Sequence, residues 1–261
     1  MDEKLEQRLQ TELQSFQTLW KGGYFEGPVL SELYFSGYGS CGYMSVLYAT
    51  YLKCIKPYIK EDTVALEIGP GRGTWTKSML GAKKIVVLDA LSAEHNGFWD
   101  YVGHRQNVEY IQVHDFSCSA LPDNYFNYMF SFGCLCHISF EGVSEYAKNL
   151  FPKLKSGCNC FWMIADYDKF NTVPQRENEL DIYIHLFSRR KKFLPLFWFY
   201  KIWKKKKPTF HKEEGDTPWP GRWYHTGLDR CCEMLEKNGY RIVEKDTETV
   251  HRDPVIHFTK D

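Results

Sequence analysis

A short apolar run followed by three closely spaced glycines constrains the fold of this chain more than any other feature. Residues 63–68 (TVALEI) are almost wholly apolar, as in a strand of a parallel sheet that is buried on both faces. Gly69, Gly71 and Gly73 then alternate with other residues, and a helical pattern begins at residue 74. Glycine permits positive φ and close approach of a ligand, and a helix N-terminus offers unpaired N–H groups. The sequence therefore predicts a strand, turn and helix that bind a nucleotide-like ligand.

The rest of the chain repeats this alternation of strand and helix patterns. The apolar runs that predict further strands are 84–89, 108–113, 126–131, 158–166, 240–248 and 253–259. The helical patterns between them are 74–81, 91–103, 140–152 and 226–238. Such an order predicts an α/β fold with a doubly wound, mostly parallel, seven-stranded Rossmann-like sheet, closed by an antiparallel C-terminal hairpin.

The first 60 residues carry helical patterns. Apolar residues at spacings of three and four predict an amphipathic helix over 1–20, and a second helix is expected over 46–59. We expect 1–60 to be a helical segment that packs on a core domain over 61–261. Within that domain, 167–222 is predicted to be an insertion that forms a lid and substrate pocket above the strand ends.

Composition excludes several classes of protein. Hydrophobic residues make up 43% and charged residues 25% of the chain, which is typical of globular proteins and not of disordered or fibrous ones. The N-terminus lacks the basic and apolar regions of a secretory signal, so a cytoplasmic location is expected. The nine cysteines lie in apolar runs and are expected to be reduced, mostly buried thiols.

Acidic residues near the glycine turn indicate which ligand it binds. Asp89 ends the second predicted strand, where a carboxylate can accept both hydroxyls of a ribose. Glu67 precedes the turn, where it would repel a pyrophosphate but suit a cationic amino group and a sulfonium. The alternative is a tight turn that binds no ligand. Acidic residues at matching places on the predicted strands argue against this alternative.

The glycine turn and its acids resemble motif I of the class I S-adenosylmethionine-dependent methyltransferases. The resemblance covers about 63–166. Residues 113–116 (VHDF) match the acid that reads the adenine in that family, and 126–137 (FNYMFSFGCLCH) look like its fourth strand and the following loop. The chain departs from the family at Asn127, where Asp is usual.

The resemblance implies S-adenosylmethionine as cofactor and assigns a set of residues to it. The residues that it implies are Glu67, Gly69, Pro70, Gly71, Gly73, Asp89, Ala90, Asp115, Phe116, Ser131 and Phe132. Aromatic residues nearer the N-terminus could close this pocket, since aromatic faces attract a sulfonium, or could be ordinary core residues. These residues are Tyr24, Phe25, Tyr34, Phe35, Tyr38 and Tyr43.

The chemistry of methyl transfer to a hydroxyl requires removal of a proton. His137 follows the fourth predicted strand, close to where the resemblance places the methyl group, and is the leading candidate for the general base. A purely structural role for His137 is equally open. Asp166 and His225 are secondary candidates for a base or an orienting acid. The cysteines near His137 lack the usual spacing of a zinc site, and no metal is expected.

Nine basic residues and no acidic ones lie within 189–207, interleaved with aromatic residues. This segment could contact an anionic membrane peripherally, attract an anionic acceptor, or pack an aromatic stripe on the core. Nucleic acid is a weaker candidate, because the rest of the chain is acidic and carries no recognition motif.

The acceptor is expected to be a small molecule or glycan, including phosphorylated ones. The chain is most similar to sugar O-methyltransferases of bacterial surface-polysaccharide or natural-product pathways. Two alternatives stay open: a small-molecule N-methyltransferase, and a non-catalytic module that binds the cofactor or associates with a membrane.

Overall fold

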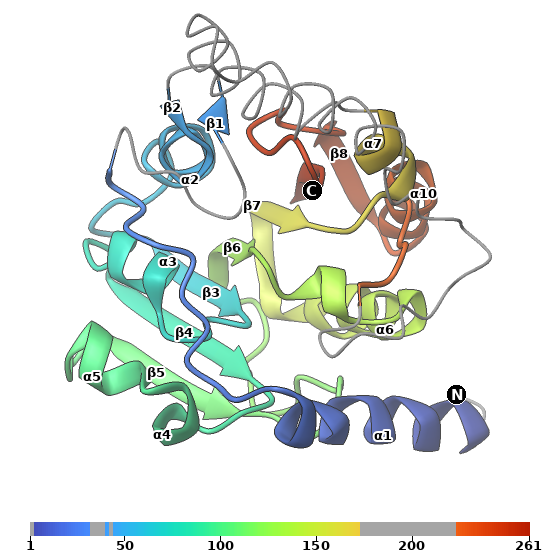
Figure 1. Cartoon of the computed structure of the whole chain (residues 1–261), viewed down its shortest axis with the longest axis horizontal. Coiled ribbons are helices and arrows are strands. Elements are labelled where there is room, and N and C mark those ends of the chain that lie inside the picture. The colour runs from blue at the N-terminus through green and yellow to red at the C-terminus, as the bar shows by residue number, and fades with distance from the viewer. Residues whose placement is uncertain (1–2, 32–39, 42–43, 173–222) are drawn as a thin grey trace, which may run out of the picture.

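A seven-stranded sheet forms the centre of the computed structural model, which describes residues 3–31, 40–41, 44–172 and 223–261 (Figure 1). The strands are β3 (Val64–Ile68), β4 (Lys84–Asp89), β5 (Val108–Gln112), β6 (Phe126–Ser131), β7 (Leu154–Met163), β8 (Tyr240–Glu244) and β9 (Val255–Lys260). Their order across the sheet is β5-β4-β3-β6-β7-β9-β8. The first five pair in parallel, and β9 is antiparallel to both of its neighbours. The predicted doubly wound sheet with an antiparallel C-terminal hairpin is confirmed.

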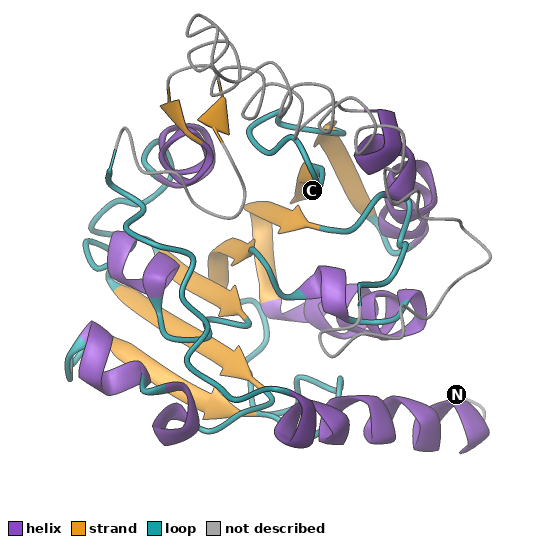
Figure 2. Cartoon of the chain, viewed as in Figure 1, coloured by secondary structure: helices purple, strands orange, loops and turns teal. Residues whose placement is uncertain are grey.

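Helices cover both faces of this sheet (Figure 2). They are α1 (Glu3–Leu19), α2 (Val46–Thr50), α3 (Thr74–Ser78), α4 (Ala93–Asn96), α5 (Phe98–Val102), α6 (Phe140–Leu150), α7 (Tyr167–Thr172) and α10 (Leu228–Lys237). A π-helical turn (Tyr51–Ile55) continues α2, and 3₁₀ turns occur at Leu135–His137 and Phe151–Lys153. A small ribbon pairs β1 (Ser40–Cys41) with β2 (Met44–Ser45).

Several predicted elements have different bounds in the structure, and the backbone explains three of these differences. The helix expected over 91–103 is two short helices, because Gly97 adopts a left-handed φ of 58° between them. The strand expected over 158–166 runs from Leu154 to Met163, because Leu154 already pairs with Phe126 of β6. A register shift and Gly157, with a φ of 76°, lie between that pair and Asn159. The strand expected over 240–248 ends at Glu244, after which the chain turns towards β9.

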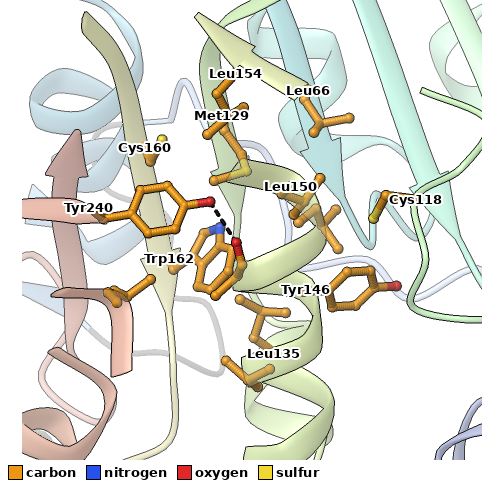
Figure 3. Close-up of a cluster of buried hydrophobic side chains, with 14 of the residues drawn as sticks. Leu66, Cys118, Met129, Leu135, Tyr146, Leu150, Leu154, Cys160, Trp162 and Tyr240 are labelled. Atoms are coloured by element: carbon orange, nitrogen blue, oxygen red, sulfur yellow. Dashed lines mark hydrogen bonds between the residues drawn. The ribbon is translucent and has the colours of Figure 1, made fainter. Parts of the chain in front are cut away.

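The alternation of side chains along the strands separates two cores. On β3, Leu66 and Ile68 face a core that includes residues of α1, α6 and α10, whereas Ala65 faces the core beside α2, α3 and α5. Figure 3 shows part of the first core, where the Tyr240 hydroxyl donates a hydrogen bond to the Ala147 carbonyl at 2.8 Å. Both faces are therefore covered, as an all-parallel centre requires.

Helix α1 is fastened to the sheet by more than apolar contacts. Leu9 and Leu13 join the first core, and Glu12 is only 7% exposed. Its carboxylate accepts hydrogen bonds from the Ser139 N–H at 2.5 Å and the Ser139 hydroxyl at 2.6 Å. Ser139 is the N-cap of α6, so this acid lies at the positive end of a helix dipole. The N-terminal segment thus packs on the core; the domain boundary at residue 60 stays a prediction.

Part of the predicted lid lies outside the described residues. Of the 167–222 segment, only α7 (Tyr167–Thr172) belongs to the described residues, and the basic run 189–207 does not. No helix in the described ranges is long and apolar enough to cross a membrane.

Replacing Glu12 with Gln should destabilise the protein, because an amide cannot accept both Ser139 hydrogen bonds with the strength of a carboxylate. We expect the free energy of unfolding to fall by about 1–3 kcal/mol, measured by urea denaturation. The matched control is Glu6→Gln, at an exposed position of the same helix. Equal stabilities of the two variants would contradict a structural role for Glu12.

Candidate functional site

A pocket opens at the carboxyl ends of β3, β4 and β6, where an open α/β sheet binds its ligands. It holds about 740 Å³ of space, its open mouth included, which suits a small-molecule ligand. Four parts of the chain supply most of its walls: α1, the segment after α1, the turns after β3 and β4, and the loop after β6. The predicted site residues in these walls are Gly69, Pro70, Gly71, Asp89, Ala90, Phe132 and His137.

The glycine turn has two distinct steric requirements. Gly69 has a φ of 69°, and a Cβ there would lie 2.3 Å from the Cβ of Cys134 in the loop after β6. Gly73 has a φ of 94°, and its missing Cβ leaves room for Val102 of α5. Gly69 therefore shapes the pocket floor, whereas Gly73 packs α3 against α5 and does not line the pocket.

Asp89 joins the glycine turn to the end of β4. Its Oδ1 accepts the Leu91 N–H at 2.9 Å, and its Oδ2 accepts the Gly71 N–H at 3.2 Å. Loss of water contact raises its pKa to about 6, and these N–H donors oppose the rise. The carboxyl is half-buried in the pocket wall, where it can accept hydroxyl groups of a ligand.

Glu67 lies beneath the pocket and outside its lining. The pleat of β3 points this side chain to the same face as Ala65, towards α3, and only 2% of it is exposed. The Thr76 hydroxyl donates a hydrogen bond to its carboxyl at 2.5 Å. Burial, with a contribution from the negative charge of Asp89, raises the pKa of Glu67 to about 8.

Residues 20–26, here called the strap, follow α1 and pass over the turns at the ends of β3 and β4 (Figure 1). The Arg72 N–H donates to the Tyr24 carbonyl at 3.3 Å, and the Gly23 N–H donates to Asn96 Oδ1 at 3.2 Å. Tyr24 lines the pocket, whereas Tyr34, Phe35, Tyr38 and Tyr43 lie outside the described residues. Phe25 instead packs on Tyr101 with ring centroids 5.3 Å apart.

The strap also contributes Glu26, which the sequence reasoning missed. Its side chain lines the pocket, and burial raises its pKa to about 8. The charge of Glu67 raises this pKa further, whereas the Trp75 indole favours the charged form. Glu26 lies in a loop, so no strand pattern in the sequence could place it at the edge of the sheet. The Gly22-Gly23 pair before it was the one indication that the chain packs closely here.

His137 lies in the pocket wall at the end of a 3₁₀ turn. The main-chain N–H of His137 donates a hydrogen bond to the Cys134 carbonyl at 2.9 Å. Its ring packs edge-on against Trp20 of the strap, with centroids 4.8 Å apart. The imidazole is half-buried and borders the pocket, a position compatible with proton transfer.

Asp166 and His225 lie together near the end of β7 and do not line the pocket. Asp166 accepts the N–H groups of Lys169 at 2.8 Å and Leu228 at 2.7 Å, and so caps the starts of α7 and α10. His225 Nδ1 accepts the Tyr167 N–H at 3.0 Å. These hydrogen bonds give both residues a structural role.

The remaining predicted residues surround the pocket or lie outside it. The Ser131 hydroxyl donates to the Ile68 carbonyl at 3.0 Å and ties β6 to β3. Phe116 is buried against Tyr146, which lines the pocket, with ring centroids 4.7 Å apart. Asp115 is exposed and accepts the Ser117 N–H at 2.8 Å in a local turn.

Neither disulfides nor a metal-binding cluster occur among the side chains that the structure describes. The eight cysteines whose side chains the structure describes are free, and all except the half-buried Cys134 are buried. Across the same ranges, no group of three or more His, Cys, Asp or Glu side chains could hold a metal ion.

The carboxyls of the pocket favour a cationic ligand, whose positive charge stabilises their ionised forms. Its lining contains two carboxyls, from Glu26 and Asp89, and no Lys or Arg from the described part of the chain. A pyrophosphate would meet these carboxyls with no basic side chain to balance it. A ligand with hydroxyls at one end and a positive charge at the other fits better.

The raised pKa of Glu67 predicts how stability depends on pH. An acid whose pKa rises on folding from 4.5 to about 8 keeps its proton in the folded protein when the unfolded chain has lost it. Stability should therefore fall as the pH rises between these values. In ligand-free protein, Glu67→Gln should flatten the fall in melting temperature between about pH 5 and pH 8. A profile parallel to that of wild type would contradict this, and the exposed Glu61→Gln is the control.

Comparisons with known proteins identify the fold. No protein-family model and no curated protein sequence matches the chain. A Pyrococcus horikoshii structure matches with a TM-score of 0.55 and 15% identity, over 82% of this chain and 92% of that one. A candidate S-adenosylmethionine-dependent methyltransferase of Listeria monocytogenes matches with a TM-score of 0.53 and 18% identity, over 82% of this chain and 99% of that one. An S-adenosylmethionine-dependent methyltransferase from Mesorhizobium loti matches with a TM-score of 0.51 and 13% identity, over 80% of this chain and 96% of that one. This chain therefore has the fold of S-adenosylmethionine-dependent methyltransferases.

Proposed function

We propose that this protein is an S-adenosylmethionine-dependent methyltransferase that transfers a methyl group to a hydroxyl or phosphate-type oxygen of a sugar or other small anionic acceptor. One observation carries the proposal: the glycine turn, the Asp89 carboxyl and an acid-lined pocket meet at one edge of a methyltransferase-like sheet. The shared fold alone would support only the scaffold.

The pocket residues fit the cofactor. Gly69 and Gly71 expose main chain without side chains to the pocket, and Asp89 offers a carboxylate for the ribose hydroxyls. Phe132, whose ring packs on Trp75 at 4.6 Å, and Ala90 add apolar surface to the walls. When bound, S-adenosylmethionine supplies a methyl group activated by its sulfonium charge.

His137 is the proposed general base. It lines the pocket, whereas Asp166 and His225 do not and are engaged in main-chain hydrogen bonds. Neutral imidazole can take a hydroxyl proton near neutral pH, and packing against Trp20 restricts where the ring can lie. This favours an oxygen acceptor over an amine, whose attack depends less on a base.

The acceptor class rests on the sequence. The basic run 189–207 would attract an anionic sugar or glycan, and it lies outside the described residues. Its peripheral contact with a membrane stays a further proposal, and vesicle sedimentation at low and high salt tests it.

Replacing Asp89 with Asn should weaken cofactor binding, because an amide accepts ribose hydroxyls less well than a carboxylate does. Isothermal calorimetry with S-adenosylmethionine should show a loss of about tenfold or more in affinity. Glu61→Gln, at an exposed position, should bind as wild type does. If wild-type protein binds neither S-adenosylmethionine nor its demethylated product at millimolar concentration, the proposed function is wrong.

Replacing His137 with Ala should lower turnover by about a hundredfold while leaving cofactor affinity nearly unchanged. Transfer of a labelled methyl group to a panel of sugars and sugar phosphates measures turnover, and calorimetry measures the affinity. A drop of less than about tenfold would reduce His137 to a structural residue of its loop.

A further inference from the structure

We propose that Glu26 of the strap, and not the Glu67 that precedes the glycine turn, recognises the positive charge of the adenosyl donor. The inference rests on the proposed function and deepens it. It assigns a specificity-determining role to a residue that lies more than forty positions before the glycine motif.

The two carboxyls that line the pocket, Asp89 and Glu26, have different neighbours. Asp89 accepts the Gly71 N–H, and its charge acts on Tyr110 of β5. The charge of Glu26 acts instead on Tyr101 of α5 and on Cys136, which follows β6. Both carboxyls line the pocket, so in our proposal the ribose lies at Asp89, the ligand crosses the glycine turn, and the methionyl group at its other end lies at Glu26. The positive charges of that group are the α-ammonium and the sulfonium.

Glu67 is poorly placed for the same task. It does not line the pocket, only 2% of it is exposed, and its carboxyl accepts the Thr76 hydroxyl at 2.5 Å. The pleat of β3 directs it under the turn, towards α3. Glu26 borders the pocket itself, and the charge of Glu67 acts on it.

No basic side chain in the described lining compensates Glu26. The nearby Arg72 guanidinium lies over the rings of Phe25, at 5.9 Å, and Tyr101, at 5.5 Å. A half-buried carboxyl with no cation beside it in the pocket lining is costly, and desolvation raises its pKa to about 8. Such a group at a pocket wall is better explained by a cationic ligand than by stability.

The strap is built to hold Glu26 at this place. A Cβ at Gly22 would lie 2.2 Å from the His95 carbonyl oxygen, so the chain lies directly on α4. The Gly23 N–H donates to the Asn96 side chain of α4, and the Arg72 N–H donates to the Tyr24 carbonyl, so the strap is fixed to α4 and to the glycine turn. A carboxyl on a segment held in this way is already positioned before the ligand arrives.

The test compares three ligands on Glu26→Gln and wild type by calorimetry at about pH 8, where an appreciable fraction of the Glu26 carboxyl is ionised. S-adenosylmethionine carries both positive charges, S-adenosylhomocysteine carries only the ammonium, and adenosine carries neither. The variant should lose about tenfold or more in affinity for S-adenosylmethionine and change by less than about twofold for adenosine. A parallel loss for S-adenosylhomocysteine identifies the ammonium as the partner; an unchanged value identifies the sulfonium.

Two further variants act as controls. Glu26→Asp keeps the charge on a shorter side chain and should restore part of the preference for S-adenosylmethionine over adenosine. Glu61→Gln makes the same chemical change at an exposed position before β3 and should bind all three ligands as wild type does.

Two results would overturn the role of Glu26: equal loss for all three ligands in Glu26→Gln, which is a structural effect, or no loss for any of them. Wild-type protein that binds none of the three would instead refute the proposed function itself.

Discussion

The parallel pairing of β3 between β4 and β6 is the constraint on which the rest of the site depends. Parallel strands end at the same edge of a sheet, so the turn after β3, the end of β4 and the loop after β6 meet there. Hydrogen bonds extend this pairing past the strands themselves. The Gly69 N–H donates to Leu88 at 2.7 Å, and the Ser131 hydroxyl donates to Ile68. The pocket floor is thus a continuation of the sheet.

The opposite wall comes from the first 26 residues, which lie far from the glycine turn in sequence. Leu13 and Phe16 of α1, together with the strap, line this side of the pocket. The hydrogen bonds between Glu12 and Ser139 hold α1 at the start of α6, only two residues beyond His137. The same helix therefore encloses the pocket and supports the loop that carries the candidate base.

Much of this site could be predicted from the sequence, because the glycine spacing and the acid at the end of β4 follow from chain-local rules. Gly69, Gly71, Asp89 and His137 all line the pocket. For residues within or just after strands, closeness in sequence to the glycine turn or to a strand end did not predict which side chains line the pocket. Glu67 is two residues from the turn, yet the pleat of β3 turns it towards α3. An acid at the end of a strand can equally cap the next helix, as Asp166 does for α7.

The sequence by itself determined the order of strands and helices, the glycine turn and the acid that ends β4, since each depends on periodicity or backbone freedom within a few residues. Only the tertiary structure decided which carboxyls face the pocket. Glu26 belongs to a loop without periodicity, and its position depends on the Gly23 and Tyr24 contacts with residues some fifty to seventy positions away. Contacts at such separations are set by the packing of the whole sheet and its helices, which no local pattern encodes.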